Sequence, residues 1–332
     1  MKRTLTALVV IGTALLVPTS AAAITYAPPD QPGPALSVPQ ADLDASLTCA
    51  GNLAAGSRGP VLLVPGTAYS PKSDFSWNWE PALTKLGIPW CVVALPGNGM
   101  GDIQTAAEYV VNGIRTMYAR AGRRIAIIGH SQGGMVPRWA FRFWPDTRTM
   151  VDDEIGLSPS NHGTLDSVPA CIPGCAPSFW QQRDNADFIQ ALNSYQETFP
   201  GISYTAAYTR TDEVVFPNIT GQGSSLHGGG GQITNVAIQQ ICPLDVSDHL
   251  AIGTYDPVAY AIAIDALSHP GPADPSRLIG TGLCRQLLMP GVNPATFATD
   301  EASSVADVAA TVAAYPHVPK EPPLRCYVTA GC

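Results

Sequence analysis

Short apolar segments followed by turns recur along the chain and predict the strands of a buried sheet. Residues 60–64, 90–95 and 124–128 are mainly apolar, and glycine, proline or small polar residues follow each of them. Apolarity that continues along a segment, rather than alternating, is typical of a strand covered on both faces. From the same pattern, further strands are predicted at residues 151–157, 202–209 and 234–242.

Segments with helical character separate these strands. Residues 102–121 form the clearest helix, because Asp102 can cap its first turn and Gly122 can end it. Pro137 lies within another predicted helix, residues 132–144, and should tighten or kink its first turn. Other helices are predicted at residues 79–86, 250–267 (with a break near Pro257) and 304–315. This alternation predicts the α/β class, with a mostly parallel central sheet and helices on both faces.

The first 23 residues have the pattern of a secretory signal peptide. Lys2 and Arg3 precede an apolar stretch at residues 5–16, and the small residues 21–23 supply a cleavage site. The apolar stretch is too short for a membrane span, and we expect no later segment to reach the roughly 18 apolar residues that a span needs. The mature protein is therefore expected to be secreted, with no transmembrane segment.

Two regions are expected after the signal peptide. Residues 24–45 are rich in Pro, Ala and Asp and should form an extended lead-in without a core of its own. Residues 46–332 have the length and pattern of a single α/β domain. The proline-rich tail from residue 316 is expected to lie over the body of that domain.

Composition and charge exclude some functions. Of the 332 residues, 45% are hydrophobic and only 13% are charged, which is typical of a globular chain. The formal net charge is −8, and removal of the two N-terminal positive residues makes it −10. Because no basic stripe is present to neutralise phosphates, we expect no nucleic-acid partner.

The eight cysteines of this chain favour disulfides over metal ligands, given the predicted export. None lies in a Cys/His cluster with the spacing of a zinc site, so no metal is expected. Sequence order by itself indicates only two local pairs, Cys171–Cys175 and Cys326–Cys332. A few free buried thiols are the alternative.

The third apolar segment ends at Gly129-His130-Ser131-Gln132-Gly133, which has the G-x-S-x-G form of a nucleophile elbow. In such an elbow the serine attacks an acyl carbon. The alternative is an ordinary glycine-rich turn in which Ser131 caps the following helix. His130 directly precedes the serine, so its side chain should point elsewhere and shape a pocket.

A serine nucleophile needs a base to take its proton and a carboxylate to orient that base. Asp212 directly follows the predicted strand 202–209, and His249 follows the next strand and a short loop. This order of Ser, acid and His is that of α/β-hydrolases, whose cooperating residues gather at the carboxyl ends of the strands. Asp245 and Asp248 compete less well, because they share the loop of the histidine. The alternative for Asp212 is a carboxylate that only caps a turn.

Acyl transfer also needs hydrogen-bond donors aimed at the oxyanion. Gln132 follows the nucleophile and would offer one backbone N–H at the start of a helix. Thr67, in the loop after strand 60–64, would offer its N–H and its hydroxyl. An ordinary turn residue is the alternative for Thr67.

Six motifs follow one another along the chain: LLVPGTAYS, DFSWNWEPALTKLGIPWCVVALP, SQGGMVPRWAFRFWP, APSFWQQ, YTRTDEVVFP and DVSDHLAIG. In this order they resemble the Candida antarctica lipase B-like family of α/β-hydrolase lipases. The similarity runs from about residue 42 to residue 284, and more loosely through the C-terminal helix. It implies the α/β-hydrolase fold with a short lid segment and a C-terminal cap helix. It also implies that Ser131, Asp212 and His249 form the catalytic triad, and that Thr67 and Gln132 form the oxyanion hole.

The resemblance also implies the disulfides Cys49–Cys91 and Cys242–Cys284, with Cys326–Cys332 as the candidate for a C-terminal one. The pair Cys171–Cys175 has no counterpart in the family and falls where the family has its mobile lid helix. A local disulfide there is expected to stiffen the lid.

Three positions are expected to line the substrate pocket. His130 stands where the family has a tryptophan, which predicts a roomier pocket on the alcohol side. Ser160 stands where the family has an aspartate and should change the polarity near the acyl group. Gln182, at the end of the APSFWQQ motif, is the third position.

Together these features predict a serine lipase or carboxylesterase that works without a cofactor. We expect it to hydrolyse acylglycerols or similar carboxylic esters through an acyl-enzyme on Ser131, to contact a lipid interface transiently and to act as a monomer. An acyltransferase, or a polyester or amide hydrolase with the same triad, is the alternative among enzymes. A secreted binding protein on this fold is the alternative from another class.

Overall fold

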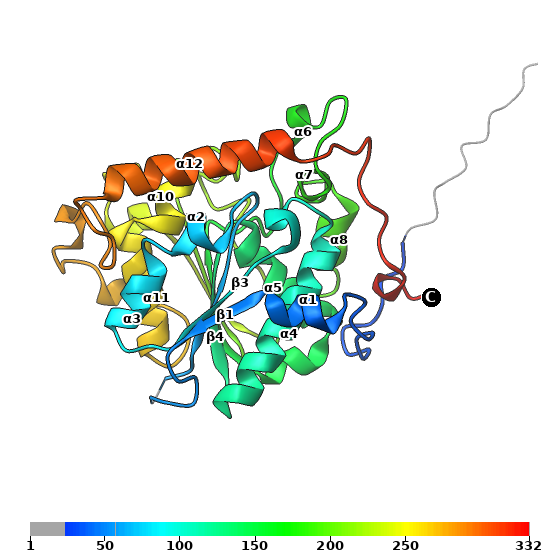
Figure 1. The fold of residues 1–332 in the computed structure, drawn as a ribbon, viewed down its shortest axis with the longest axis horizontal. Coiled ribbons are helices and arrows are strands. Elements are labelled where there is room, and N and C mark those ends of the chain that lie inside the picture. Colours follow the sequence, from blue (N-terminus) through cyan, green and yellow to red (C-terminus); the bar gives the residue numbers. More distant parts are fainter. Residues whose placement is uncertain (1–23, 57, 332) are drawn as a thin grey trace, which may run out of the picture.

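The computed structural model describes residues 24–56 and 58–331, and a seven-stranded sheet forms its centre (Figure 1). The strand order is β1-β3-β2-β4-β5-β6-β7. β1 pairs antiparallel with β3, and the other neighbouring strands pair in parallel, which confirms the predicted fold class. The strands are β1 (Leu47–Ala50), β2 (Val61–Val64), β3 (Trp90–Val93), β4 (Ile125–His130), β5 (Val151–Leu157), β6 (Ser203–Tyr208) and β7 (Gln232–Ala237). The predicted signal peptide, residues 1–23, lies outside the described residues.

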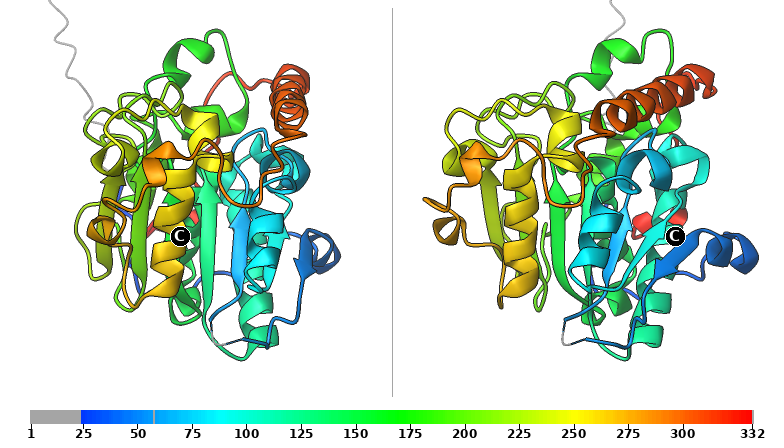
Figure 2. Two further views of the ribbon diagram at one scale, coloured as in Figure 1. Left: turned by 90° about the vertical axis from the view of Figure 1, so that its left-hand side faces the viewer. Right: turned by 60° about the vertical axis from the view of Figure 1, so that its left-hand side comes forward.

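Helices cover both faces of the sheet. α4 (Ile103–Ala121), α5 (Gln132–Phe143) and α8 (Asp187–Leu192) share one buried cluster with one face of the strands. α3 (Trp79–Lys85) and α11 (Pro257–Ser268) share a second cluster with the other face. Figure 1 shows the two groups on opposite sides of the sheet, and Figure 2 shows α11 lying along its face.

Strand β4 explains why the predicted strands are apolar throughout. Ile125 and Ile127 belong to the first buried cluster, whereas Ala126 and Ile128 belong to the second. Because successive side chains of a strand point to opposite faces, a strand covered on both faces needs apolar residues at every position.

The remaining elements are the C-terminal helix and a set of short helices and turns. The C-terminal helix α12 (Phe297–Ala314) runs across the carboxyl ends of the parallel strands in Figure 1. The other helices are α1 (Gln40–Ala45), α2 (Pro71–Phe75), α6 (Ser167–Ala170), α7 (Pro177–Gln181), α9 (Ile238–Ile241) and α10 (His249–Thr254). Short 3₁₀ turns lie at Pro96–Gly99, Pro145–Thr149, Pro275–Arg277, Leu283–Arg285 and Cys326–Val328.

Helix α4 has the caps that the sequence predicts. The carboxylate of Asp102 accepts the N–H of Gln104 at 3.0 Å, and Gly122 ends the helix with a φ of 66°. Helix α5 continues past Pro137 to Phe143. The predicted break near Pro257 falls between α10 and α11, where this proline is the first residue of α11.

Three predicted boundaries are wrong. The strand predicted over residues 234–242 ends at Ala237, and α9 follows because Ile238 and Ile241 turn into the second buried cluster. The lead-in is not extended throughout, since residues 40–45 form α1, which buries Leu43. Helix α12 begins at Phe297 rather than at residue 304.

One stretch contradicts the expectation about membrane spans. Within the described residues, His249–Ser268 is long and apolar enough to qualify by composition. Since 72% of this stretch is buried inside the protein, it is a core element here, and its apolarity serves packing against the sheet.

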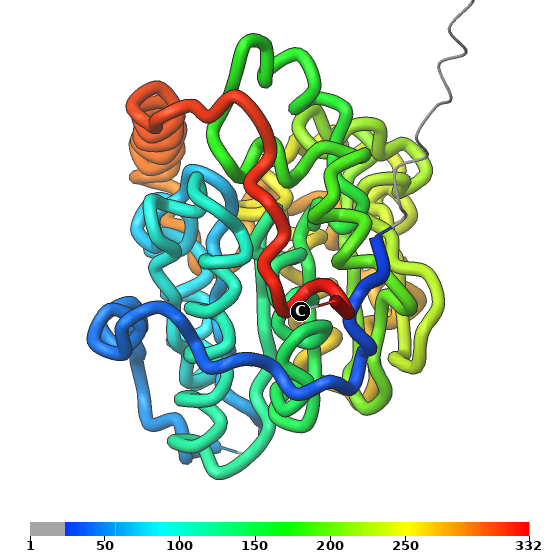
Figure 3. Tube along the Cα trace, turned by 90° about the vertical axis from the view of Figure 1, so that its right-hand side faces the viewer, coloured from blue at the N-terminus to red at the C-terminus, as the bar shows by residue number. Residues whose placement is uncertain are grey.

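The two ends of the described chain lie side by side (Figure 3). The Ala27 N–H donates to the Val328 carbonyl at 2.9 Å, and the Ala330 N–H donates to the Thr25 carbonyl at 2.9 Å. The tail reaches this place by crossing α4, where the Gln104 side chain donates to the Pro323 carbonyl at 3.1 Å. The predicted position of the tail over the body is therefore the one observed.

Three disulfides join described residues: Cys49–Cys91, Cys171–Cys175 and Cys242–Cys284. The first links the edge strand β1 to its neighbour β3, and the third links the end of α9 to the 3₁₀ turn at Leu283–Arg285. The expected pair Cys326–Cys332 reaches outside the described residues, because Cys332 is not among them.

Candidate active site

Ser131 occupies a sharp turn between β4 and α5. Its φ of 55° and ψ of −122° are strained for a residue with a side chain. A Cβ at Gly129 would lie 2.0 Å from the Gly133 carbonyl oxygen, and a Cβ at Gly133 would lie 1.9 Å from the Val64 carbonyl oxygen. Both glycines of the motif are therefore required by the close approach of β4, α5 and β2. This is the backbone of a nucleophile elbow.

Asp212 and His249 lie in direct contact, although 37 positions separate them in the chain. The His249 Nδ1 is 3.0 Å from each carboxylate oxygen of Asp212. The backbone N–H groups of Val214 and Val215 donate to Oδ1 at 3.0 and 2.7 Å and hold this carboxylate. Since Nδ1 donates to the carboxylate, Nε2 is left with a lone pair that can accept a proton.

The charges of this pair support each other. Burial alone would lower the pKa of His249, but the Asp212 carboxylate, with help from Glu213 and Asp248, raises it above its usual value. Burial alone would raise the pKa of Asp212, but the facing His249 and its hydrogen bond lower it below the usual range. The arrangement therefore favours a carboxylate beside a histidine that takes up a proton readily.

We expect the activity to have an acid limb above pH 6.5, the usual pKa of histidine. Only neutral His249 can accept a proton, and a raised pKa keeps the ring protonated to higher pH. Activity should therefore be lost as the pH falls through this raised pKa. Because Glu213 contributes to the rise, Glu213→Gln should move the limb to lower pH. The measurement is kcat/KM against pH for the wild type and the variant. If activity is lost over the same pH range in both, His249 is not the group whose protonation causes the loss.

Thr67 and Gln132 lie together beside the elbow. The Thr67 Oγ1 accepts amide N–H groups from the side chains of Gln132 and Gln182, each at 2.9 Å. Two accepted hydrogen bonds use both lone pairs of the hydroxyl, so its own hydrogen is free to donate elsewhere. The sequence prediction did not foresee that Gln132 would use its side chain in this way.

A cavity of about 180 Å³ connects these groups. Ser131, His249 and Thr67 line it. Apolar side chains make up most of the remaining wall, which suits an acyl or alkyl group. They are contributed by the loops and by α7 and α12, and include Phe179, Val214, Val215, Val308 and Val312.

Two of the three predicted pocket residues line this cavity, and the third does not. Ser160 donates its hydroxyl hydrogen to Gln182 Oε1 at 2.9 Å, and both residues line the wall. His130 is absent from the wall and is fully buried, because its ring nitrogens contact Asp74 and the His249 carbonyl. The prediction that His130 lines the pocket is therefore wrong, and Tyr69 lines the cavity next to the His130 ring. The roomier pocket on the alcohol side stays a prediction.

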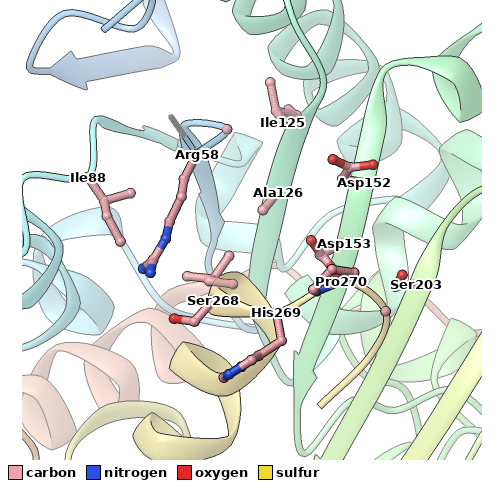
Figure 4. Close-up of a pocket in the computed structure, with 13 residues that line it drawn as sticks. Arg58, Ile88, Ile125, Ala126, Asp152, Asp153, Ser203, Ser268, His269 and Pro270 are labelled. Carbon is pink, nitrogen blue, oxygen red and sulfur yellow. The ribbon is translucent and has the colours of Figure 1, made fainter. Parts of the chain in front are cut away.

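A larger cavity, of about 430 Å³, lies at the opposite end of the strands (Figure 4). Its wall includes Ile125, at the start of β4, and Ser203, at the start of β6. Asp152 and Asp153 contribute carboxylates, but no elbow serine is present there. Because active sites of parallel sheets lie at the carboxyl ends, the smaller cavity is the candidate site.

Sequence reasoning missed Asp74 and Glu213 as parts of the site. The Glu213 carboxylate accepts the backbone N–H of His249 at 3.1 Å, and Asp74 accepts the N–H of Gly66 at 2.9 Å. Both residues lie within motifs quoted above, Asp74 at the start of DFSWNWEPALTKLGIPWCVVALP and Glu213 in YTRTDEVVFP. Neither had a predicted role, because a motif does not record which distant backbone group a carboxylate will contact. Among the described residues, no group of three or more His, Cys, Asp or Glu side chains is arranged to hold a metal ion.

Comparisons with known proteins place this geometry in context. The chain is 33% identical to lipase B of Pseudozyma antarctica over 310 residues, which cover 90% of this chain and 87% of that protein. The crystal structure of Aspergillus fumigatus lipase B superposes with a TM-score of 0.80 at 30% identity, and the match covers 90% of this chain and 74% of that chain. No protein-family model matches the sequence.

Proposed function

The chain belongs to the lipase B family of α/β-hydrolases, and on this basis we propose that it hydrolyses carboxylic esters with Ser131 as nucleophile. His249 is the base, Asp212 the acid that orients it, and Thr67 and Gln132 supply the oxyanion hole. The observation that carries the proposal is that Ser131, His249 and Thr67 line one cavity. Asp212 contacts the His249 ring, and the Gln132 side chain donates to Thr67. The strained serine, the paired imidazole and the free threonine hydrogen belong to the same cavity region.

Acylation follows from this geometry. The Ser131 Oγ attacks the ester carbonyl carbon while its proton passes to His249 Nε2, and the carbonyl oxygen becomes an oxyanion. The hydroxyl hydrogen of Thr67 and the backbone N–H of Gln132, at the start of α5, donate to that oxyanion. The tetrahedral intermediate then collapses, and His249 gives its proton to the alkoxide, which leaves as an alcohol. The acyl group stays on the Ser131 Oγ as an acyl-enzyme. In the second half of the reaction, water gives a proton to His249 and attacks the acyl-enzyme, and the carboxylic acid is released as Ser131 regains its proton.

A fluorophosphonate probe and an ester series test the proposal together. The probe should label wild-type protein at Ser131, and peptide mapping identifies the modified residue. Turnover of acyl esters of increasing chain length, both dissolved and emulsified, should depend on the same serine and separates carboxylesterase from lipase. Absence of labelling with intact fold would favour a binding protein without catalysis.

Two enzyme alternatives use the same residues. In an acyltransferase the acyl-serine is resolved by an alcohol, and in a polyester or amide hydrolase the leaving group differs. Product analysis with a competing alcohol or amine distinguishes them from a simple ester hydrolase. We propose hydrolysis as the main activity, because the chain belongs to the lipase B family.

The lid segment gives a prediction of its own. Cys171–Cys175 closes a loop beside Thr164 and Ser167, which line the cavity. If this disulfide holds the wall in place, the double change Cys171→Ser and Cys175→Ser should raise KM for long-chain esters roughly two- to tenfold, because the wall must then be ordered on binding. Short-chain esters, which reach less of this wall, serve as the control. An unchanged ratio of long- to short-chain KM would overturn this role.

We further propose that the protein is secreted after removal of residues 1–23 and acts as a monomer that contacts a lipid interface transiently. The disulfides support an oxidising compartment. Side chains exposed beside the cavity loops, among them Leu165, Ile172 and Phe216, support contact with lipid. Fractionation of the producing cells and sedimentation with vesicles test these two points.

A further inference from the structure

Two buried ionisable side chains lie beside the elbow and have no role in the chemistry above. Asp74, on α2, and His130, the last residue of β4, are both 0% exposed. The Asp74 Oδ1 lies 2.9 Å from the His130 Nδ1. A protein with apolar side chains of similar volume in place of a buried charged pair is often equally stable. A contribution to folding stability is therefore not a sufficient reason for this pair to be present.

The pair connects two loops of the candidate active site. On one side, Asp74 Oδ2 accepts the N–H of Gly66 at 2.9 Å, directly before Thr67. On the other side, His130 Nε2 lies 3.1 Å from the backbone carbonyl oxygen of His249. A continuous path of hydrogen bonds thus runs from the oxyanion loop to the backbone of the proposed base.

The donors along this path follow from the acceptors. A carbonyl oxygen only accepts, so His130 Nε2 must carry a hydrogen. One more proton lies between Nδ1 and Asp74 Oδ1, because two facing lone pairs at 2.9 Å would repel each other. Each of the linking atoms is then satisfied, and a satisfied buried network is rigid.

Packing holds the His130 ring in one orientation. The ring of Tyr69 lies 5.2 Å from it and the ring of His249 lies 5.1 Å from it, measured between centroids. A Cβ on Gly253, in α10, would lie only 2.3 Å from the His130 Nε2. Space for the ring therefore depends on a glycine one turn after the base.

We propose that Asp74 and His130 form a positioning pair, which fixes the position of the Gly66–Thr67 backbone relative to the His249 backbone for ester hydrolysis. This inference rests on the proposed function. The oxyanion donors and His249 Nε2 must act on one tetrahedral centre, and a misplacement of about 1 Å can cost roughly 100-fold in rate. The pair touches no reacting atom, so it acts through Thr67 and His249.

The first test compares two replacements of Asp74. Asp74→Asn keeps the path, because its oxygen can accept from Gly66 N–H and its amide can donate to a neutral His130 Nδ1. Asp74→Leu has similar bulk and breaks both hydrogen bonds. We expect Asp74→Leu to lower kcat roughly 10- to 100-fold with little change in KM, and Asp74→Asn to restore most of it.

Rates are expressed per active site, titrated with the fluorophosphonate, so that a loss of folded protein does not enter kcat. A normal kcat in Asp74→Leu would overturn the proposal, as would an effect confined to KM. Equal losses in the Leu and Asn variants would also overturn it, because the hydrogen-bond path and not the charge is proposed to position the loops.

Gly253→Ala provides a second test that leaves Asp74 intact and applies even where Asp74→Leu does not fold. Alanine is favourable in a helix, so the change acts chiefly by pushing on the His130 ring. The expected result is again a lower kcat per active site with little change in KM. An unaltered kcat would contradict the positioning role.

Asp265→Leu is the matched control. This buried carboxylate of α11 binds Arg277 and does not line the cavity. We expect lower thermal stability with kcat per active site unchanged. The two proposals fail separately: if Ser131→Ala retains activity, the proposed function fails, whereas Ser131-dependent turnover with a normal Asp74→Leu variant removes only the positioning pair.

Discussion

Replacing Ser131 with alanine should lower kcat at least about ten-thousand-fold, the scale observed when a triad nucleophile is removed. The hydroxyl is the only atom of this residue that the mechanism uses, and alanine accepts the same turn without added bulk. The measurement is the initial rate on a dissolved ester, per folded protein. Residual catalysis from the oxyanion hole and binding should remain detectable above the reaction in water.

A control separates loss of the nucleophile from loss of the fold. Ser46 is buried, and its hydroxyl donates only to the Leu43 carbonyl, at 2.7 Å. Ser46→Ala should lower stability by about 1 kcal/mol and leave turnover intact. The Ser131 variant should melt near the wild-type temperature and lose fluorophosphonate labelling. Near-normal ester hydrolysis by Ser131→Ala would show that another residue attacks the ester.

Replacing Asp212 with asparagine should lower kcat about ten-thousand-fold while leaving the fold in place. The carboxylate accepts from His249 Nδ1, which places the lone pair of the ring at Nε2. An asparagine amide would donate to Nδ1 instead, so the ring hydrogen would move to Nε2 and block proton transfer from Ser131. Steady-state kinetics at several pH values provide the measurement.

The neighbouring carboxylate is the matched control for this change. Glu213 contacts the backbone N–H of His249 and not its ring nitrogens. Glu213→Gln should therefore change kcat only a few-fold at the optimal pH. If both variants lost activity equally, the special role of Asp212 would be untenable.

Much of the fold was predictable from local patterns. The apolar segments at residues 60–64, 90–95 and 124–128 correspond to β2, β3 and β4, because burial on both faces requires apolar residues at every position. β1 escaped prediction, since a half-exposed edge strand such as Leu47–Ala50 lacks that pattern. The start of α12 escaped as well, since this helix lies on the surface and Ser304 is its one buried residue.

The part of the candidate site that depends on chain order and on the ends of strands was predictable. The G-x-S-x-G motif points to Ser131. Asp212 and His249 each follow a predicted strand in the order of the triad, and residues in that position meet at one edge of a parallel sheet. The side chain of His130 was not predictable in the same way. Its position next to Ser131 indicated a pocket residue, whereas the structure buries its ring away from the cavity.

By itself, the sequence determined the buried parallel strands, the elbow and the order of the proposed triad, because these depend on the residue types along single segments. Only the tertiary structure decided what surrounds them. Asp74 meets His130 across 56 positions of sequence, and His130 meets the His249 carbonyl across 119. Such contacts arise when distant elements pack and each buried polar atom must find a partner. Which partner a buried polar atom finds depends on its position in the folded protein, and the spacing of residues along the chain does not indicate it.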